Sequence, residues 1–173
     1  SPDLLEHLID EGKKPDTGVK MNTLDVVDQM SEILLAGSET TSGTIAAFFL
    51  EVTRNENVKA RLLQSLPARS PLDTLIDAKT IRADPKYAYL EACLKETLRL
   101  HPIASEMGRT TGKRSVVIAN HTLPPHTIVS VSYRKLHLDP EFWPEPRRFW
   151  PERWLEPAIN QPREAPPPEY VFS

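Results

Sequence analysis

The sequence has little cysteine, little glycine and no excess of positive charge. It holds one Cys and 6 Gly in 173 residues, and 21 Lys and Arg against 24 Asp and Glu give a formal net charge of −3. One cysteine cannot close a disulfide within the chain, which excludes a disulfide-stapled secreted domain. Nucleic-acid binding favours a clearly basic surface, so the mildly acidic balance argues against a nucleic-acid partner.

Long hydrophobic runs are also missing. The mean hydropathy is −0.40, and the longest strictly apolar run, near residues 45–50, is far shorter than the roughly 20 residues of a membrane-spanning helix. We therefore expect any membrane anchor to lie outside this sequence. The length permits one ordinary domain. Because the chain begins without Met and stops in an apolar, aromatic stretch, we expect residues 1–173 to form one incomplete domain.

Proline is abundant but unevenly placed. Of 17 Pro, five precede residue 86 and nine lie between residues 140 and 168. Proline breaks helices, so the early part of the chain can be helical and the late part cannot. The composition predicts a mainly α fold with one small β hairpin, and a Pro-rich loop or meander over residues 157–169.

The hydrophobic pattern predicts three helices and a hairpin. A long helix over residues 24–53 is apolar on nearly every side in its middle, which is typical of a helix that is buried all round. Shorter helices are predicted over residues 58–66 and 84–100, the last with Asp84 as N-cap and Pro85 in the first turn. Residues 116–119 and 127–133 favour the two strands of the hairpin. Asn120 and His126, which tolerate positive φ, lie in its connection.

Small and hydroxyl side chains interrupt the long helix over residues 36–41, Ala-Gly-Ser-Glu-Thr-Thr. Helical spacing places Gly37, Thr40 and Thr41 on one face, with Ala36 beside them. Such a face can receive a large flat partner, with a hydroxyl and the Glu39 carboxylate available to handle protons. Close packing of two helices is the other interpretation, and the face alone favours it.

Glu96 and Arg99 lie three residues apart on one face of a helix. Glu-x-x-Arg occurs four times in this sequence, so spacing alone does not single out this pair. Its surroundings do, because it lies in an otherwise apolar last turn, where a buried pair needs a further polar partner. Arg153, flanked by aromatic residues and Pro, can supply that partner, although an exposed arginine in a loop explains its pattern equally well.

Taken in order, these segments resemble the cytochrome P450 family of haem-thiolate monooxygenases. Residues 36–41 are similar to its Ala/Gly-Gly-x-Asp/Glu-Thr-Thr/Ser motif in the long helix, and residues 95–102, Lys-Glu-Thr-Leu-Arg-Leu-His-Pro, to its Glu-x-x-Arg helix. Residues 137–140, His-Leu-Asp-Pro, and 149–154, Phe-Trp-Pro-Glu-Arg-Trp, resemble the segment that ends in a Pro-Glu-Arg-Phe signature, with Trp154 in place of Phe. The resemblance covers residues 24–155 and implies a partial cytochrome P450 fold.

The resemblance also implies roles for individual residues. Haem would lie on the face formed by Ala36, Gly37 and Thr41, and Arg109 would bind a haem propionate. Thr40 would hydrogen-bond dioxygen and help deliver protons, with Glu39 connecting to solvent. Glu96, Arg99 and Arg153 would form the structural triad of the family. The residues expected to face substrate are Leu35, Ile103, Ala104 and Ser105.

One element of the family pattern is missing. The axial cysteine of the family follows a Phe-x-x-Gly-x-Arg-x-Cys loop, and Phe172 resembles the first residue of that loop. We therefore expect the metal ligand beyond Ser173, and we interpret Cys93 as a buried small hydrophobic residue. Without an anionic sulfur there is no electron push for O–O cleavage, so we expect these 173 residues alone to bind haem poorly and catalyse nothing.

The expected activity of the parent enzyme is insertion of an oxygen atom into a small, lipophilic organic substrate. The resemblance implies an NADPH-dependent reductase as electron donor and location at the endoplasmic reticulum membrane. Two alternatives remain. The parent could be a peroxide isomerase or dehydratase of the same fold, or the chain could be a non-catalytic helical interaction module.

Overall fold

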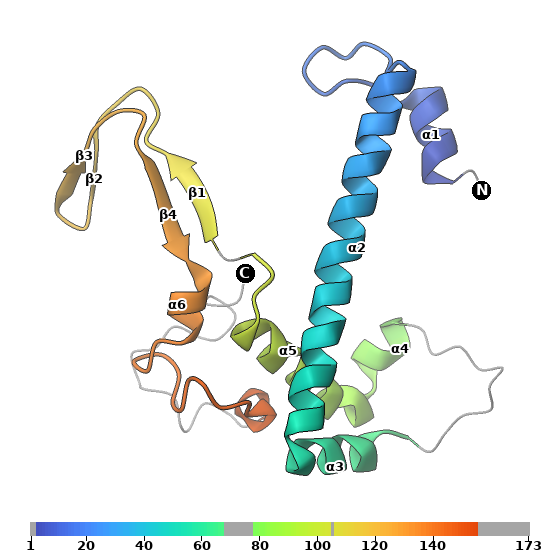
Figure 1. The fold of residues 1–173 in the computed structure, drawn as a ribbon, viewed down its shortest axis with the longest axis vertical. Coiled ribbons are helices and arrows are strands. Elements are labelled where there is room, and N and C mark those ends of the chain that lie inside the picture. Colours follow the sequence, from blue (N-terminus) through green and yellow to red (C-terminus); the bar gives the residue numbers. More distant parts are fainter. Residues whose placement is uncertain (1–2, 68–77, 105, 156–173) are drawn as a thin grey trace. The chain divides into compact units, whose positions relative to one another are not determined.

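The computed structural model describes residues 3–67, 78–104 and 106–155 (Figure 1). Ser105 and the predicted Pro-rich meander at 157–169 lie outside the described residues. The chain divides into two compact units, residues 1–43 and 44–173. One helix, α2 (Thr23–Arg54), runs through the boundary.

The first unit opens with a helix that the sequence patterns did not predict, α1 (Leu4–Glu11), capped by the Asp3 carboxylate. At the start of α2, Asn22 Oδ1 accepts from the backbone N–H groups of Leu24 and Asp25 at 2.9 and 3.1 Å. Asp25 Oδ2 in turn accepts from the Asn22 N–H at 2.9 Å, so the two residues cap the helix reciprocally. Lys14 Nζ lies 2.9 Å from Asp25 Oδ1, and this bond lowers the pKa of Asp25.

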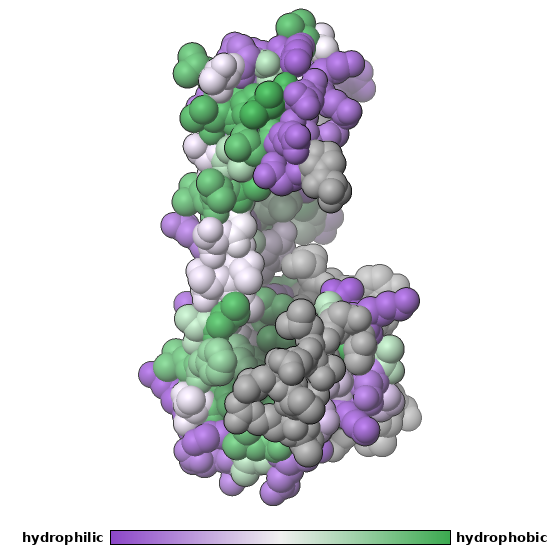
Figure 2. All heavy atoms as spheres, turned by 90° about the vertical axis from the view of Figure 1, so that its right-hand side faces the viewer, coloured by the Kyte–Doolittle hydropathy of each residue, from purple (hydrophilic) through white to green (hydrophobic). Residues whose placement is uncertain are grey.

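Helix α2 has 32 residues, close to the predicted range. Val26 and Val52 near its ends are buried, but the apolar side chains in its middle are not buried by the described part of the chain: Leu34, Leu35 and Phe49 are about 60% exposed. Figure 2 shows that hydrophobic residues cover a large part of the surface in that view. An apolar pattern on all sides indicates that a helix is suited to burial, but it does not show which residues cover the helix.

The same helix also meets a length and hydropathy criterion for a membrane span, with a mean hydropathy of 1.3 in an 18-residue window. The exclusion drawn from the longest strictly apolar run was therefore too strict, because Gly, Ser and Thr interrupt such a run while lowering the mean only slightly. Interior helices of soluble proteins meet this criterion as well, so it does not place α2 in a membrane.

Two helices of the second unit, α3 (Glu56–Ser65) and α5 (Ala88–Leu100), pack around one small core. Between them in the sequence lie α4 (Ala78–Ala83) and a 3₁₀ turn, η1 (Pro85–Tyr87), which leads directly into α5. Asp84 Oδ1 accepts from the Lys86 N–H at 3.0 Å and caps this turn. The core packs α2, α3 and α5 against a Pro-rich coil, residues 138–150. Its buried side chains are Val52, Val58, Leu62, Tyr89, Cys93 and Phe149.

The strands pair differently from the predicted hairpin. β2 (Val116–Ile118) pairs with β3 (His121–Leu123), and β4 (Ile128–Ser132) pairs with β1 (Glu106–Thr110). Both pairs are antiparallel, and in the β1–β4 pair Glu106 lies opposite Ser132. Val116–Ile118 and Ile128–Ser132, expected to be partners, therefore belong to separate pairs. Ala119 and Asn120 have φ of 47° and 64° and make the two-residue turn between β2 and β3.

Two short helical segments lie in the late part of the chain. α6 (Tyr133–His137) follows β4 directly, and its first turn is capped by Ser132 Oγ, which accepts from the Lys135 N–H at 3.4 Å. After a series of turns, the 3₁₀ helix η2 (Pro151–Trp154) packs against α5. The Pro-rich coil between α6 and η2, residues 138–150, thus lies between two elements that contact α5.

Candidate functional site

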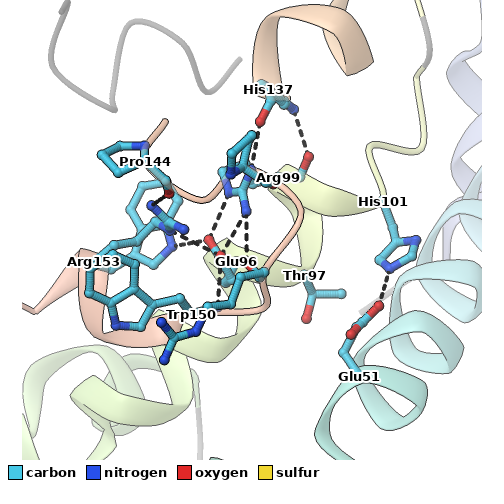
Figure 3. A network of polar contacts seen from close by, with 12 residues as sticks. Glu51, Glu96, Thr97, Arg99, His101, His137, Pro144, Trp150 and Arg153 are labelled. Carbon is cyan, nitrogen blue, oxygen red and sulfur yellow. Dashed lines mark hydrogen bonds and ion pairs between the residues drawn. The ribbon is translucent and has the colours of Figure 1, made fainter. Parts of the chain in front are cut away.

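Glu96 of α5 is the centre of a buried polar network (Figure 3). Its carboxylate is fully buried and accepts five hydrogen bonds. The donors are Arg99 Nε at 2.9 Å, Arg99 Nη2 at 2.8 Å, the Trp150 N–H at 2.9 Å, Arg153 Nε at 3.1 Å and Trp154 Nε1 at 3.0 Å. Three of these donors come from the coil and η2, so one carboxylate holds the coil against α5.

Arg99 uses its remaining donors on backbone carbonyl groups. Its Nη1 donates to the carbonyl oxygens of His137 at 2.6 Å and Pro146 at 2.8 Å, and its Nη2 reaches that of Arg148 at 3.3 Å. The ring of Trp143 lies 5.1 Å from its guanidinium carbon. A guanidinium has five donors in a fixed plane, and here they bridge α5, α6 and the coil.

Arg153 completes the network from η2. Besides Glu96, it donates from Nη1 to the Pro144 carbonyl oxygen at 3.1 Å, and its guanidinium carbon lies 4.8 Å from the Trp150 ring centroid. Burial lowers the pKa of Arg153, while the Glu96 charge acts to raise it. Arg153 Nη2 and Trp143 Nε1 are buried and have no hydrogen-bond partner within the part of the chain that the structure describes.

Burial separates this pair from the other Glu-x-x-Arg pairs. Glu145 and Arg148 form the same i, i+3 ion pair at 3.0 Å, but both side chains are 57% exposed, against 0% for Glu96 and Arg99. Glu51 pairs with His101 at 2.7 Å instead of with an arginine. Exposed pairs contribute about 0–1 kcal/mol, whereas removing one partner of a buried pair costs about 3–5 kcal/mol.

The hydroxyl face of α2 is open to solvent in the described chain. Ala36, Gly37, Thr40 and Thr41 are all exposed, and Thr40 Oγ1 donates to the Ala36 carbonyl oxygen at 2.7 Å. A Cβ added to Gly37 would have no atom within 4 Å. Glu39 and Leu35 are also exposed. The face is therefore flat and accessible, and it carries at least one hydroxyl that is hydrogen-bonded within its own helix.

Three further predicted site residues lie in β1 or in the connection that leads from α5 to β1. Arg109 of β1 is exposed, and its Nη1 reaches only the Gly108 carbonyl oxygen at 3.4 Å among described atoms. Ile103 and Ala104 are exposed in the connection between α5 and β1. Arg109 and the α2 face belong to different compact units of the chain.

Cys93, the one cysteine of the sequence, has no access to solvent. Burial raises the pKa of its thiol to about 12. A metal ligand must be the thiolate, which this environment disfavours. Among the described residues, no cluster of three or more His, Cys, Asp or Glu side chains could hold a metal ion.

Two residues that help to hold α6 and η2 in place, His137 and Glu152, were not predicted from the sequence. His137 offers its carbonyl oxygen to Arg99, and its Nδ1 lies 3.1 Å from the Arg99 carbonyl oxygen; only its place in the His-Leu-Asp-Pro segment marked it. Glu152 of η2 accepts from Arg61 at 2.8 Å and from the Tyr89 hydroxyl at 2.9 Å. No spacing rule in the sequence joins residues so far apart.

Comparison with known proteins identifies the family of this chain. The model of the cytochrome P450 family matches residues 1–170. The chain belongs to this family.

The relatives span mammals, plants and bacteria. The chain is 34% identical over 154 residues to cytochrome P450 3A12 of Canis lupus familiaris, with 88% of this chain and 30% of the relative covered. It is 32% identical over 155 residues to cyclooctat-9-en-7-ol 5-monooxygenase of Streptomyces melanosporofaciens, covering 88% and 32%. It is 31% identical over 142 residues to (S)-N-methylcoclaurine 3′-hydroxylase isozyme 2 of Eschscholzia californica, covering 81% and 28%. The chain thus spans about a third of the length of these relatives.

Family membership implies haem, and the residues fit part of a haem site. An exposed face without bulky side chains at Gly37 suits a flat ring, and the exposed Arg109 guanidinium suits a propionate. The chemistry of Cys93 does not fit the iron ligand, because its thiol is buried and remains protonated. Taken separately, the α2 face suits the wall of a haem site and Arg109 suits a propionate, whereas Cys93 does not suit the axial ligand.

Proposed function

We propose that the protein to which these residues belong is a haem-dependent monooxygenase that oxidises or hydroxylates an organic substrate. The observation that carries the proposal is the exposed hydroxyl face of α2, with Thr40 beside Glu39, in a chain of the cytochrome P450 family. The names of two relatives, a monooxygenase and a hydroxylase, support the same class of activity.

In this proposal the α2 face and β1 bind the cofactor. Ala36, Gly37 and Thr41 would form a flat wall, and Arg109 would bind a propionate through its exposed guanidinium. Haem would supply the redox chemistry that activates dioxygen. Because the Cys93 thiol is buried and its pKa is raised, it does not suit the iron ligand, so the 173 residues alone should bind haem poorly and show no activity.

Thr40 and Glu39 would handle protons. The Thr40 hydroxyl donates to the Ala36 carbonyl oxygen at 2.7 Å, so it must rotate away from that oxygen before it can give its proton elsewhere. A hydroxyl that exchanges partners in this way can pass a proton on. Glu39, next to it and exposed to solvent, would return the proton from water.

The remaining assignments concern the substrate and partners. Exposed apolar side chains at Leu35 and Ile103, together with Ala104 and Ser105, would face the substrate, which favours a small, lipophilic compound. Electrons would come from an NADPH-dependent reductase. We propose location at the endoplasmic reticulum membrane, with attachment through a segment outside these residues.

The experiment replaces Thr40 by Ala in an enzyme that contains residues 1–173 and measures how much of the NADPH consumed appears as product. A monooxygenase that loses its proton-handling hydroxyl should divert reducing equivalents to hydrogen peroxide. Thr53→Ala is the matched control, because Thr53 lies on the same helix and also donates to the carbonyl four residues back, at 2.6 Å.

Each alternative predicts a different result. A peroxide isomerase or dehydratase consumes no NADPH, and its turnover should not depend on Thr40. A helical interaction module should show no turnover with or without the substitution. Unchanged coupling in Thr40→Ala, or the same uncoupling in Thr53→Ala, would contradict the proposed role of Thr40.

A further inference from the structure

A small pocket of about 150 Å³ lies beside the end of α5, within the second unit. Its wall is built from α2, α5, α6 and the coil, through Glu51, Leu100, His101, Arg134, Leu138 and Arg147. None of these residues has a place in the proposed activity. The pocket is therefore a separate feature whose chemistry can be considered by itself.

Positive charge predominates in this pocket. Two guanidinium groups, those of Arg134 and Arg147, line it, and neither makes a hydrogen bond or ion pair with another described residue. Its one carboxylate, that of Glu51, is already engaged by His101 Nε2 at 2.7 Å (Figure 3). Two arginine cations thus face one carboxylate that already has a partner, so the pocket carries an uncompensated positive charge.

The segments that carry the pocket are held together by Arg99. His101 follows it by two residues, and Arg134 lies one turn before His137, whose carbonyl oxygen accepts from Arg99 at 2.6 Å. Arg147 lies between Pro146 and Arg148, whose carbonyl oxygens accept from Arg99 at 2.8 and 3.3 Å. Because one buried side chain fixes all three backbones, the two lining arginines start from fixed positions, and less ordering is needed when a ligand binds.

We propose that this pocket binds a small oxyanion, a phosphate or carboxylate group, through the guanidinium groups of Arg134 and Arg147. An arginine presents parallel N–H donors that match the oxygens of such groups. The volume of about 150 Å³ admits a group of that size. A ligand held by both arginines would connect α6 to the coil, next to the carbonyl groups that Arg99 holds, and would stabilise this junction.

The experiment measures thermal unfolding of a protein that contains residues 1–173, titrated with inorganic phosphate or acetate, with potassium chloride at matched ionic strength. Binding to the folded state should raise Tm along a saturating curve that chloride does not reproduce. Phosphate and acetate together separate the two oxyanions: a response to either one supports the site and names its preferred group.

The variants Arg134→Gln and Arg147→Gln test the residues. Each removes charge-assisted hydrogen bonds to the ligand and should weaken its binding roughly tenfold, and no described hydrogen bond is lost. Lys135→Gln is the matched control, since it makes the same change of charge on α6 outside the pocket wall. A Tm response that chloride reproduces, or that persists unchanged in the Arg134→Gln, Arg147→Gln double variant, would overturn the proposal.

Discussion

Replacing Glu96 by Gln tests the buried network most directly. The substitution keeps the shape of the side chain and removes its charge, while Arg99, with no exposed surface, and Arg153, 8% exposed, stay in place. All five hydrogen bonds to Glu96 come from N–H donors, and an amide NH₂ cannot accept any of them. Two buried cations then lack their counter-ion, for which the expected loss is about 3–5 kcal/mol of unfolding free energy.

A matched control lies in the Pro-rich coil that Glu96 holds against α5. Glu145→Gln breaks an ion pair of identical spacing to Arg148, but both partners are 57% exposed, so the expected loss is below about 1 kcal/mol. Urea unfolding of a protein that contains residues 1–173 compares the two variants, because a lower midpoint at unchanged slope reports stability alone. Equal midpoints for Glu96→Gln and Glu145→Gln would refute the view that burial gives this network its strength.

Two further predictions concern the backbone and the thiol. His126 has a φ of 58°, and His126→Gly should stabilise the fold by about 0.5–1 kcal/mol, because relief of roughly 1–2 kcal/mol of left-handed strain exceeds the entropy cost of glycine. Thermal unfolding measures the change, with His121→Gly as the control. A lower Tm for His126→Gly would contradict the reasoning. Cys93, with its pKa raised to about 12, should resist alkylation at pH 8 until the protein unfolds. Because the folded thiol keeps its proton longer than the unfolded one, Cys93 should make stability fall as pH rises from about 9 to 12, and Cys93→Ala should lessen that fall.

The sequence predicted local features better than pairings. The N-cap at Asp84 and the positive φ of Asn120 and His126 follow from residue type, because a short carboxylate caps a turn and these two side chains tolerate left-handed backbone. The strand pairing was wrong because Ala119-Asn120 lacks the Asn-Gly signal of a two-residue turn, while the prolines at 124 and 125 suggested a longer connection. Helix α1 was not predicted although Asp3 caps it, because a helix of 8 residues is too short to be stable by itself, and the sequence pattern does not show what supports it.

Long-range contacts were the least accessible to sequence reasoning. The five donors around Glu96 come from residues up to 58 positions away, and two of the acceptors of Arg99 are carbonyl oxygens of Pro146 and Arg148. A backbone carbonyl carries no sequence signature, so a motif can mark the side chains of such a network and leave half of its partners unseen.

The two parts of the candidate site differ in what they need from elsewhere. The carboxylate of Glu96 has all its donors among the described residues, and burial makes that network costly to break. The α2 face at Ala36, Gly37 and Thr40 has the reverse character, since it is exposed and its chemistry depends on whatever lies against it. The network around Glu96 is therefore expected to form whether or not a cofactor is bound, while exposed apolar surface on α2 favours any partner that removes it from water.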